Sequence, residues 1–364
     1  MMRRREMMLG CAALLAAVRP GRAAAEQLVG GRVIPDPPSQ ILRDVPDTPI
    51  EKIPNFRRLM RGVVRELGDV AHKRGLQVLV RNAPEMLVKD RLEALWEEKR
   101  EPGQPHTPQG SLFEDYLAAV DGVMIDGLIC GYGGFGQPTP NDQSARFWEL
   151  AGQMKKAGKS VFTVDYSKDK AMAALVRKRA RQAGFVPYLD TGGDETLKQV
   201  PSGRAWDERS EHIDHVSEAR NWLPCFGGEA FHSRQAWIDR LAATNYDVLV
   251  LDPFRNGEAL SKADIDALKV KVMGTRRLVL AVLPVGIANA DRWYWKPDWR
   301  AGNPSYLLGP LEEDPKAWLT TYWAGEWEKL LGTYFNGLAD LGVDGFLLDS
   351  VDAYTLFEDR YPID

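Results

Sequence analysis

The sequence predicts an α/β fold, a (β/α)8 barrel of the TIM type, because six short apolar runs end in polar residues. Five runs end on aspartate, at Asp126, Asp165, Asp190, Asp252 and Asp349, and a sixth, LQVLVRN, ends on Asn82. Such runs, bounded by turn residues, are typical of strands buried on both faces. Helical stretches follow most of them, which indicates parallel strands whose carboxyl ends share one rim. In an α/β barrel, that rim carries the active site.

The composition is that of an ordinary globular protein. The chain has 364 residues, of which 44% are apolar and 27% are charged. That is ample material for a large core, and a single α/β barrel reaches this length. Because the formal net charge is -4, we expect no nucleic-acid surface.

The first 25 residues have the pattern of an export signal. Arg3, Arg4 and Arg5 precede the apolar run MMLGCAALLAAV, and RAAA follows before Glu26. A charged start, a short apolar middle and small residues at the end are typical of a signal peptide. The run is too short to span a bilayer as an ordinary helix. Cleavage near Ala25 would leave a periplasmic or secreted protein without a membrane span.

The rest of the chain divides into an arm and one domain. Residues 26–50 hold several prolines and little periodicity, so we expect a linker or surface arm. Strands and helices alternate through residues 51–364, and we count eight strands. Residues 191–218 interrupt the alternation, because they are polar and carry no strand. Eight units with right-handed crossovers close into a barrel.

The helices follow from apolar periodicity. We expect them near residues 55–73, 86–99, 112–120, 142–157, 168–183, 233–243, 261–272 and 324–341. The first has its apolar stripe at Phe56, Leu59, Val63, Leu67 and Val70. A doubly wound open sheet is the competing fold, but it would usually carry a phosphate-binding glycine turn after its first strand. The stretch GYGGFG resembles such a turn only superficially, because prolines follow where a helix should open.

Six stretches of the sequence carry a family resemblance. The most specific are RWYWKPDWRAGNPSYLLGP and GVDGFLLDSVDAYTLFE, and the others are YDVLVLDPF, RGLQVLVRNAPEML, YLAAVDGVMIDGL and KAGKSVFTVDYS. They resemble glycoside hydrolase family 114, the endo-α-1,4-polygalactosaminidases and related extracellular TIM-barrel proteins, across most of residues 51–364. The resemblance implies a glycosidase that cleaves α-linked polysaccharide, with a galactosamine-containing polymer as first candidate. It implies no cofactor and no metal, and the sequence identifies no protein partner.

The order of these stretches is unusual. In the relatives, the block ending in VDAY lies mid-chain, and a segment like NFRRLMRGVVRELGDVAHKRGLQVLVRN follows it, whereas here that segment comes first. The resemblance therefore implies a circular permutation, with family strands five to eight before strands one to four. Residues 191–218 would be the tether between the halves. Barrel termini lie close together, so the rearrangement is physically permitted. The alternative, two tandem half-domains, is disfavoured because neither half closes a sheet.

The resemblance also implies a catalytic pair. Glycoside hydrolysis uses two carboxyl groups flanking the scissile bond, one as acid and one as nucleophile or base. Asp349 matches the family's strand-four aspartate, which implies the nucleophile or base. Asp126 stands where the family has a glutamate at the end of strand six, which implies the acid. Aspartate is one methylene shorter, and catalysis depends on placement within a fraction of an ångström.

Departures from the family pattern motivate a second hypothesis, a catalytically inactive, exported carbohydrate-binding barrel. Besides Asp126, Pro284 and Ile287 stand where relatives typically have Ser and Glu. Arg81 is a further departure, because relatives tend to have Gln there. The next residue, Asn82, still offers a donor and an acceptor to a sugar hydroxyl.

Other residues near the rim are candidates for substrate binding. Asp165 and Asp252 end strands and would contact hydroxyl or amine groups, although each is equally well explained as a helix cap. Asp352, three residues beyond Asp349, would bind sugar or, as we favour, brace the loop.

Aromatic residues gather in one long loop. Six of the eleven tryptophans lie between residues 293 and 327. Aromatic rings suit the apolar faces of sugars, and a protonated amino sugar adds a cation–π contribution. Among the aromatic residues of this loop, we expect Trp293, Tyr294 and Trp295 to contact substrate. Most of the others should pack the loop onto the barrel.

Overall fold

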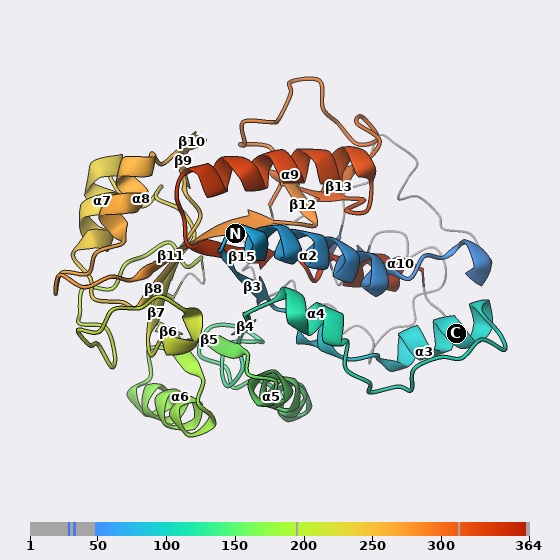
Figure 1. Ribbon diagram of the computed structural model, residues 1–364, viewed down its shortest axis with the longest axis horizontal. Helices are drawn as coiled ribbons and strands as arrows, with labels where there is room; N and C mark the ends of the chain where they lie inside the picture. The colour runs from blue at the N-terminus through green and yellow to red at the C-terminus, as the bar shows by residue number, and fades with distance from the viewer. Residues whose placement is uncertain (1–27, 30–31, 34–47, 194–195, 312–313, 362–364) are drawn as a thin grey trace.

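The computed structural model describes residues 28–29, 32–33, 48–193, 196–311 and 314–361. Eight parallel strands form one curved, nearly closed sheet with helices around its outside (Figure 1). The strands are β3 (Gln77–Arg81), β4 (Gly122–Asp126), β5 (Ser160–Tyr166), β6 (Val186–Asp190), β7 (Trp222–Cys225), β8 (Val248–Leu251), β11 (Leu278–Pro284) and β15 (Gly345–Asp349). The predicted α/β fold of the TIM-barrel type is confirmed.

The strand order joins the two ends of the chain inside the sheet. Around the barrel the order is β6-β5-β4-β3-β15-β11-β8-β7, so the first barrel strand pairs with the last. Val78 of β3, for example, is in register with Phe346 of β15. The opening in the ladder lies between β6 and β7, which flank residues 191–218. β3 and β7 therefore stand on opposite sides of the barrel.

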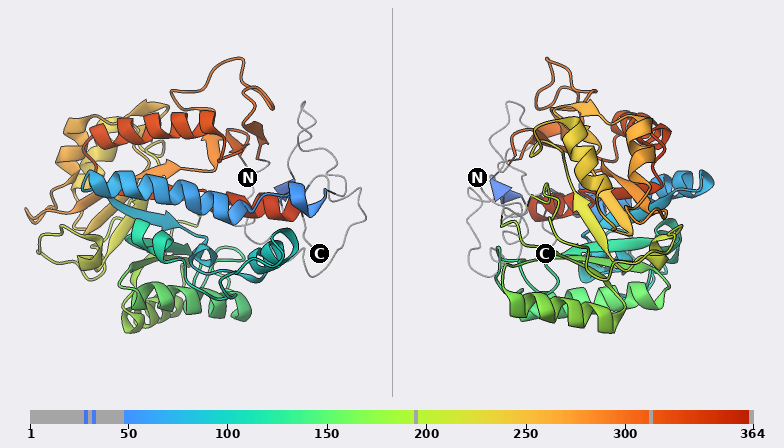
Figure 2. Two further views of the ribbon diagram at one scale, coloured as in Figure 1. Left: turned by 45° about the vertical axis from the view of Figure 1, so that its right-hand side comes forward. Right: turned by 90° about the vertical axis from the view of Figure 1, so that its left-hand side faces the viewer.

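The outer helices agree with the predicted pattern, apart from some ends. They are α2 (Phe56–Lys73), α3 (Arg91–Arg100), α4 (Glu114–Ala119), α5 (Asn141–Lys156), α6 (Lys170–Ala183), α7 (Arg234–Ala242), α8 (Lys262–Leu268), α9 (Gly325–Asp340) and α10 (Ala353–Arg360). The helix predicted near 86–99 is split into the 3-10 turn η4 (Pro84–Leu87) and α3. The structure adds α10, which lies beside α2 (Figure 2).

Helix α2 buries a slightly different face from the predicted stripe. Phe56, Val63 and Leu67 are buried as expected, but Val70 is 43% exposed, so that part of the prediction was wrong. Met60, which is fully buried, belongs to the face instead. The Asn55 side chain caps the helix by accepting from the N–H of Arg58 at 2.9 Å.

The long segment between β11 and α9 is more ordered than a loop. It contains a three-stranded antiparallel sheet with the order β12-β14-β13. These strands are β12 (Ile287–Asn289), β13 (Leu307–Pro310) and β14 (Ala317–Thr320). Trp318 lies on this sheet, whereas Trp293, Tyr294, Trp295 and Trp299 lie in the segment that joins β12 to β13.

The segment between β6 and β7 runs along the opening of the barrel and carries no strand in its described part, residues 191–193 and 196–218. Near the carboxyl rim, the carbonyl of Leu197 accepts from the N–H of Phe226 at 2.7 Å. Near the opposite rim, the N–H of Val216 donates to Gln77 Oε1 at 2.7 Å. The segment thus takes the place of the crossover helix between the two halves.

Three aspartates at the amino ends of strands tie neighbouring strands together. Asp121, just before β4, accepts from the N–H of Val78 at 2.7 Å, and Asp344, just before β15, accepts from the N–H of Val279 at 2.9 Å. Asp247, just before β8, accepts from the N–H of Arg220 at 2.9 Å. This rim therefore uses its carboxylates to hold the barrel.

Two predictions lie largely outside the described residues. The export signal over 1–25 does, as does most of the arm over 26–50, of which the short antiparallel strands β1 (Leu28–Val29) and β2 (Arg32–Val33) are described. Among the described residues, no helix is long and apolar enough to cross a membrane.

Candidate functional site

The strand order brings the two candidate catalytic aspartates onto one rim. β15, which ends at Asp349, pairs with β3, and β3 pairs with β4, which ends at Asp126. Parallel strands present their carboxyl ends on the same side, so both side chains belong to the same mouth. The two positions are far apart in the sequence but only two strands apart in the barrel.

Arg81, the last residue of β3, lies between the two aspartates. Its Nη2 donates to Asp126 Oδ2 at 2.7 Å, and its Nε donates to the same oxygen at 3.0 Å. Its Nη1 is 3.3 Å from both oxygens of Asp349. The guanidinium carbon lies 5.0 Å from the centroid of the Phe226 ring, which follows β7 on the far side of the barrel. Arg81 therefore extends across the mouth and joins both carboxylates.

Asp126 is fully engaged by its neighbours. Besides Arg81, its Oδ2 accepts from Asn82 Nδ2 at 3.3 Å, and its Oδ1 accepts from the Tyr166 hydroxyl at 3.0 Å. The Asn82 amide oxygen in turn accepts from the Asp126 backbone N–H at 3.1 Å. Asp126 is 2% exposed. The predicted binding residue Asn82 thus acts on the aspartate and fixes its position.

The electrostatics of Arg81 follow from this pairing. Burial alone would lower the pKa of Arg81, but the carboxylates of Asp126 and Asp349 outweigh it and raise that pKa above its usual range. The guanidinium is therefore permanently charged. A positive charge this close to a carboxylate favours the ionised form of the acid.

Asp349 is the more accessible member of the pair. Its side chain is 13% exposed, against 3% for Asp126. Its Oδ1 accepts from the N–H of Ser350 at 2.8 Å, and its backbone carbonyl accepts from Val285 at 2.9 Å. In the β11–β15 ladder it is in register with Pro284, one of the family departures.

The backbone at this part of the rim adopts sparsely populated conformations. Asn82 and Ala83, after β3, have φ angles of 57° and 50°, and Ser350, after β15, has a φ angle of 60°. Left-handed conformations cost non-glycine residues about 1–3 kcal/mol each. Such conformations cluster at functional sites, so they mark the exits of β3 and β15 as constrained by the surrounding structure.

Asp165 has a bracing position. It is fully buried, and its Oδ1 accepts from the N–H groups of Ile129 at 2.7 Å and Cys130 at 2.8 Å. It therefore holds the glycine-rich loop after β4 against β5. This is the environment of a structural carboxylate, and no face of the side chain is open to a ligand.

Asp252 pairs with a residue of the aromatic segment. Arg292 forms an ion pair with Asp252 and lies over the Phe254 ring, 4.5 Å from its centroid. Burial raises the pKa of Asp252, and the neighbouring Arg292 opposes that shift. The next residue, Trp293, is 55% exposed. The pair thus anchors an exposed indole at the β8 side of the mouth.

The other predicted aromatic contacts pack inward. Tyr294 is buried, and its hydroxyl accepts from the N–H of Asn289 at 2.9 Å. Trp295 is half-buried, and its ring centroid lies 5.1 Å from that of Trp318. Among the tryptophans that the structure describes, Trp293 alone is exposed. Most of the aromatic cluster therefore packs, as expected.

Asp352 stands just before α10 and is half-buried. Its main-chain carbonyl accepts from the Thr355 hydroxyl at 2.8 Å. The negative charge of Asp352 also affects Glu85 in η4. Burial raises the pKa of Glu85, and Asp352 raises it further. The exits of β15 and β3 thus place two carboxyl groups near each other outside the mouth.

Sequence reasoning missed the residues that organise the site. Arg81 was noted only as a departure from the family, although an arginine closing the apolar strand QVLVR is a signal in itself. Tyr166 follows Asp165 directly and was not singled out. Arg292 and Phe226 carry no local pattern, since they reach the mouth from loops.

Comparisons with known proteins give distant relatives. No family model matches the chain. An uncharacterized protein of Methanocaldococcus jannaschii is 24% identical over 171 residues, which cover 47% of this chain and 49% of the relative. Uncharacterized proteins of Thermotoga maritima and Deinococcus radiodurans are each 25% identical, over 38% and 35% of this chain and 43% and 40% of their own lengths. The chain thus spans about half or less of the relatives it matches.

Proposed function

We propose that this protein is an exported carbohydrate-binding barrel whose rim pair Asp126 and Asp349 no longer cleaves glycosidic bonds. The observation that carries the proposal is the position of Arg81, whose guanidinium bonds to both carboxylates. A glycosidase needs the glycosidic oxygen between its two carboxyl groups, with one of them protonated. Here a permanent cation occupies that place.

The chemistry of the pair argues against hydrolysis. The acid must carry a proton, yet Arg81 favours the ionised form of Asp126. The transition state has oxocarbenium character, and a guanidinium next to it opposes the developing positive charge. Asp126 is also 2% exposed, so an incoming leaving group has little access to it.

Binding remains chemically reasonable at this rim. Asp349 is partly exposed and offers carboxylate oxygens to sugar hydroxyls. Trp293, beside the Asp252–Arg292 pair, offers an open aromatic face. Together these groups supply the polar and apolar contacts that a sugar ring uses.

The permuted order belongs to the same proposal. One finding supports it: the ladder opens between β6 and β7, next to the proposed tether, and not between the first and last barrel strands.

A second candidate is a working glycosidase that uses Asp349, favoured by the partial exposure of that side chain. Arg81 would then have to leave the pair when substrate enters. One experiment separates the two: binding and reducing-end release measured on the same preparation with a panel of α-linked and amino-sugar polysaccharides. The proposal expects binding, weakened by Trp293→Ala, without release. Release that Asp349→Asn abolishes would establish the glycosidase instead.

A further inference from the structure

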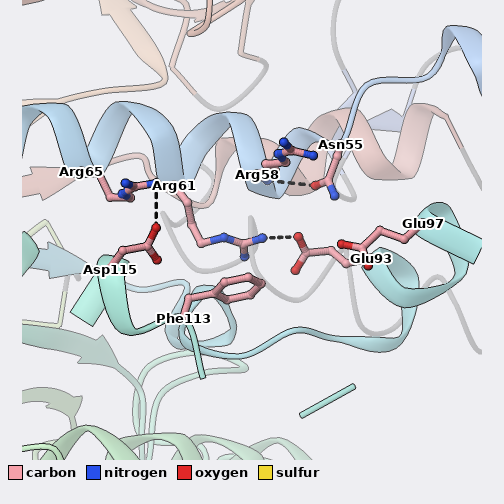
Figure 3. A pocket seen from close by; sticks show the side chains of 8 residues that line it. All are labelled: Asn55, Arg58, Arg61, Arg65, Glu93, Glu97, Phe113 and Asp115. Carbon is pink, nitrogen blue, oxygen red and sulfur yellow. Dashed lines mark hydrogen bonds and ion pairs between the residues drawn. The ribbon is translucent and has the colours of Figure 1, made fainter. Parts of the chain in front are cut away.

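A pocket opens on the outside of the barrel between α2, α3 and the segment leading into α4 (Figure 3). Its volume is about 340 Å³. The residues that line it are Asn55, Arg58, Arg61, Arg65, Glu93, Glu97, Phe113 and Asp115. None of them belongs to a barrel strand, so the pocket is distinct from the rim around Arg81.

Two ion pairs inside the pocket match most of its charges. Arg61 and Glu93 are both buried and pair with each other, and the Arg61 guanidinium carbon lies 3.7 Å from the centroid of the Phe113 ring. Arg65 and Asp115 pair at 2.8 Å nearer the surface. These pairs, visible in Figure 3, form the walls.

The third acid, Glu97, is matched from behind the pocket. The buried Lys89 forms an ion pair with it and also donates to the Thr107 carbonyl at 2.6 Å. His106 Nδ1 lies 3.2 Å from the same carboxylate. Glu97 therefore contributes little uncompensated charge to the cavity.

Two polar groups remain for a ligand. Glu93 Oε2 is buried and has no hydrogen-bond partner among the described residues. A buried carboxylate oxygen without a donor is costly, so it favours a ligand that brings one. Arg58, in contrast, is exposed at the edge of the pocket and forms no ion pair with any residue the structure describes. It favours a ligand that brings an anion.

We propose that this pocket binds a small zwitterion, with its ammonium on Glu93 and its carboxylate on Arg58. An ammonium supplies the donors that the buried carboxylate oxygen lacks, and a carboxylate matches the guanidinium fork. A simple anion would satisfy Arg58 alone, and a simple amine would satisfy Glu93 alone. The site is independent of any function at the barrel rim.

The test is calorimetric titration of the full chain with glycine, γ-aminobutyrate and ε-aminocaproate. Acetate, butyrate, caproate, methylamine, butylamine and hexylamine are the matched compounds that lack one charge. At least one amino acid should bind, and its matched acid and amine should each bind about tenfold more weakly, since each loses one charge-assisted contact.

Four variants locate the binding. Glu93→Gln and Arg58→Gln should each weaken it about tenfold or more, because each removes one charged partner. Glu98→Gln and Arg91→Gln change exposed residues of α3 that do not line the pocket, and should leave it unchanged. Arg58 is exposed, so its variant should fold normally, and circular dichroism checks both pocket variants.

Three results would overturn the zwitterion site. One is the absence of binding by all three amino acids. Another is binding that survives Glu93→Gln and Arg58→Gln within about twofold, which would place the ligand elsewhere. Tighter binding of inorganic phosphate or glucose than of every amino acid would replace it with an anion or polyol site.

Discussion

The two rims of the barrel use their aspartates differently. At the amino ends of the strands, Asp121, Asp247 and Asp344 each accept a backbone N–H group, from a neighbouring strand or from Arg220, two residues before β7. At the carboxyl ends, Asp126 and Asp349 are joined through the side chain of Arg81. The amino-rim carboxylates also form separate ion pairs, Asp247 with Lys271 and Asp344 with Arg276, whereas Asp126 and Asp349 share the one guanidinium that lies between them. This difference supports the carboxyl rim as the binding end.

The largest effect should come from Asp247→Asn at the amino rim. Asp247 and Lys271 are both fully buried and pair at 2.7 Å, so the variant leaves a buried ammonium without its carboxylate. We expect the free energy of unfolding, measured with guanidinium chloride, to fall by about 3–5 kcal/mol. Asp266→Asn, at an exposed acid of α8, should change it by less than about 0.5 kcal/mol. Equal effects of the two variants would contradict a stabilising role for the buried Asp247–Lys271 pair at the amino rim.

Arg81→Gln should have the next largest effect on the free energy of unfolding. It leaves Asp126 buried but still bonded to Tyr166 and Asn82, so we expect a loss of about 3 kcal/mol at pH 7. Urea unfolding of the wild type and the variant at pH 7 measures this loss. An unchanged free energy of unfolding would show that Arg81 does not compensate these carboxylates.

A third prediction concerns a side-chain pair that joins α2 to α10. Arg57 donates to both oxygens of Glu358, at 2.7 Å and 2.9 Å. Burial nevertheless raises the pKa of Glu358 from 4.5 to about 7, with Arg57 opposing the shift. Because the folded-state pKa is raised, the stability linked to this proton is fully present below about pH 4.5 and is lost as the pH rises through 7.

Glu358→Gln should remove that dependence. Between pH 5 and pH 8 the wild type should lose about 2–3 kcal/mol of unfolding free energy more than the variant. Glu326→Gln, at an exposed position of α9, should show the same pH dependence of the unfolding free energy as the wild type. Parallel pH curves for wild type and Glu358→Gln would contradict the shifted titration.

The smallest effect on stability should come from Trp293→Ala. The side chain is 55% exposed, so the free energy of unfolding should change by less than about 0.5 kcal/mol. Glycan binding should weaken about three- to tenfold, because an aromatic contact contributes roughly 0.5–1.5 kcal/mol. Trp327 is buried and donates to the Val285 carbonyl. Trp327→Phe should therefore lower the free energy of unfolding and leave glycan binding unchanged. Unchanged binding by Trp293→Ala would remove this indole from the site.

Much of the fold was predictable because buried parallel strands have a strong local signal. The eight strands of four to seven residues were each marked by an apolar run. β12, β13 and β14 were missed, since strands of three or four residues among prolines, glycines and tryptophans carry no clear alternation. Helix α10 was missed because its eight residues end near the C-terminus, where the periodicity is short.

The site was less predictable than the fold. Strand ends placed Asp126 and Asp349 at one rim, but strand alternation did not reveal that the Arg81 side chain reaches between them. That contact depends on the pairing of β15, β3 and β4, which brings together residues from both halves of the chain. The contacts of Asp252 with Arg292 depend likewise on the path of a long segment.

The most direct test of the central claim is reducing-end release by the wild type and Arg81→Gln, compared on any polysaccharide that the wild type binds. If Arg81 blocks the carboxylate pair, the wild type should bind the polymer and release no detectable ends. Sustained release by the wild type that is abolished in Arg81→Gln would contradict the account, because the guanidinium would then be part of a working catalytic site.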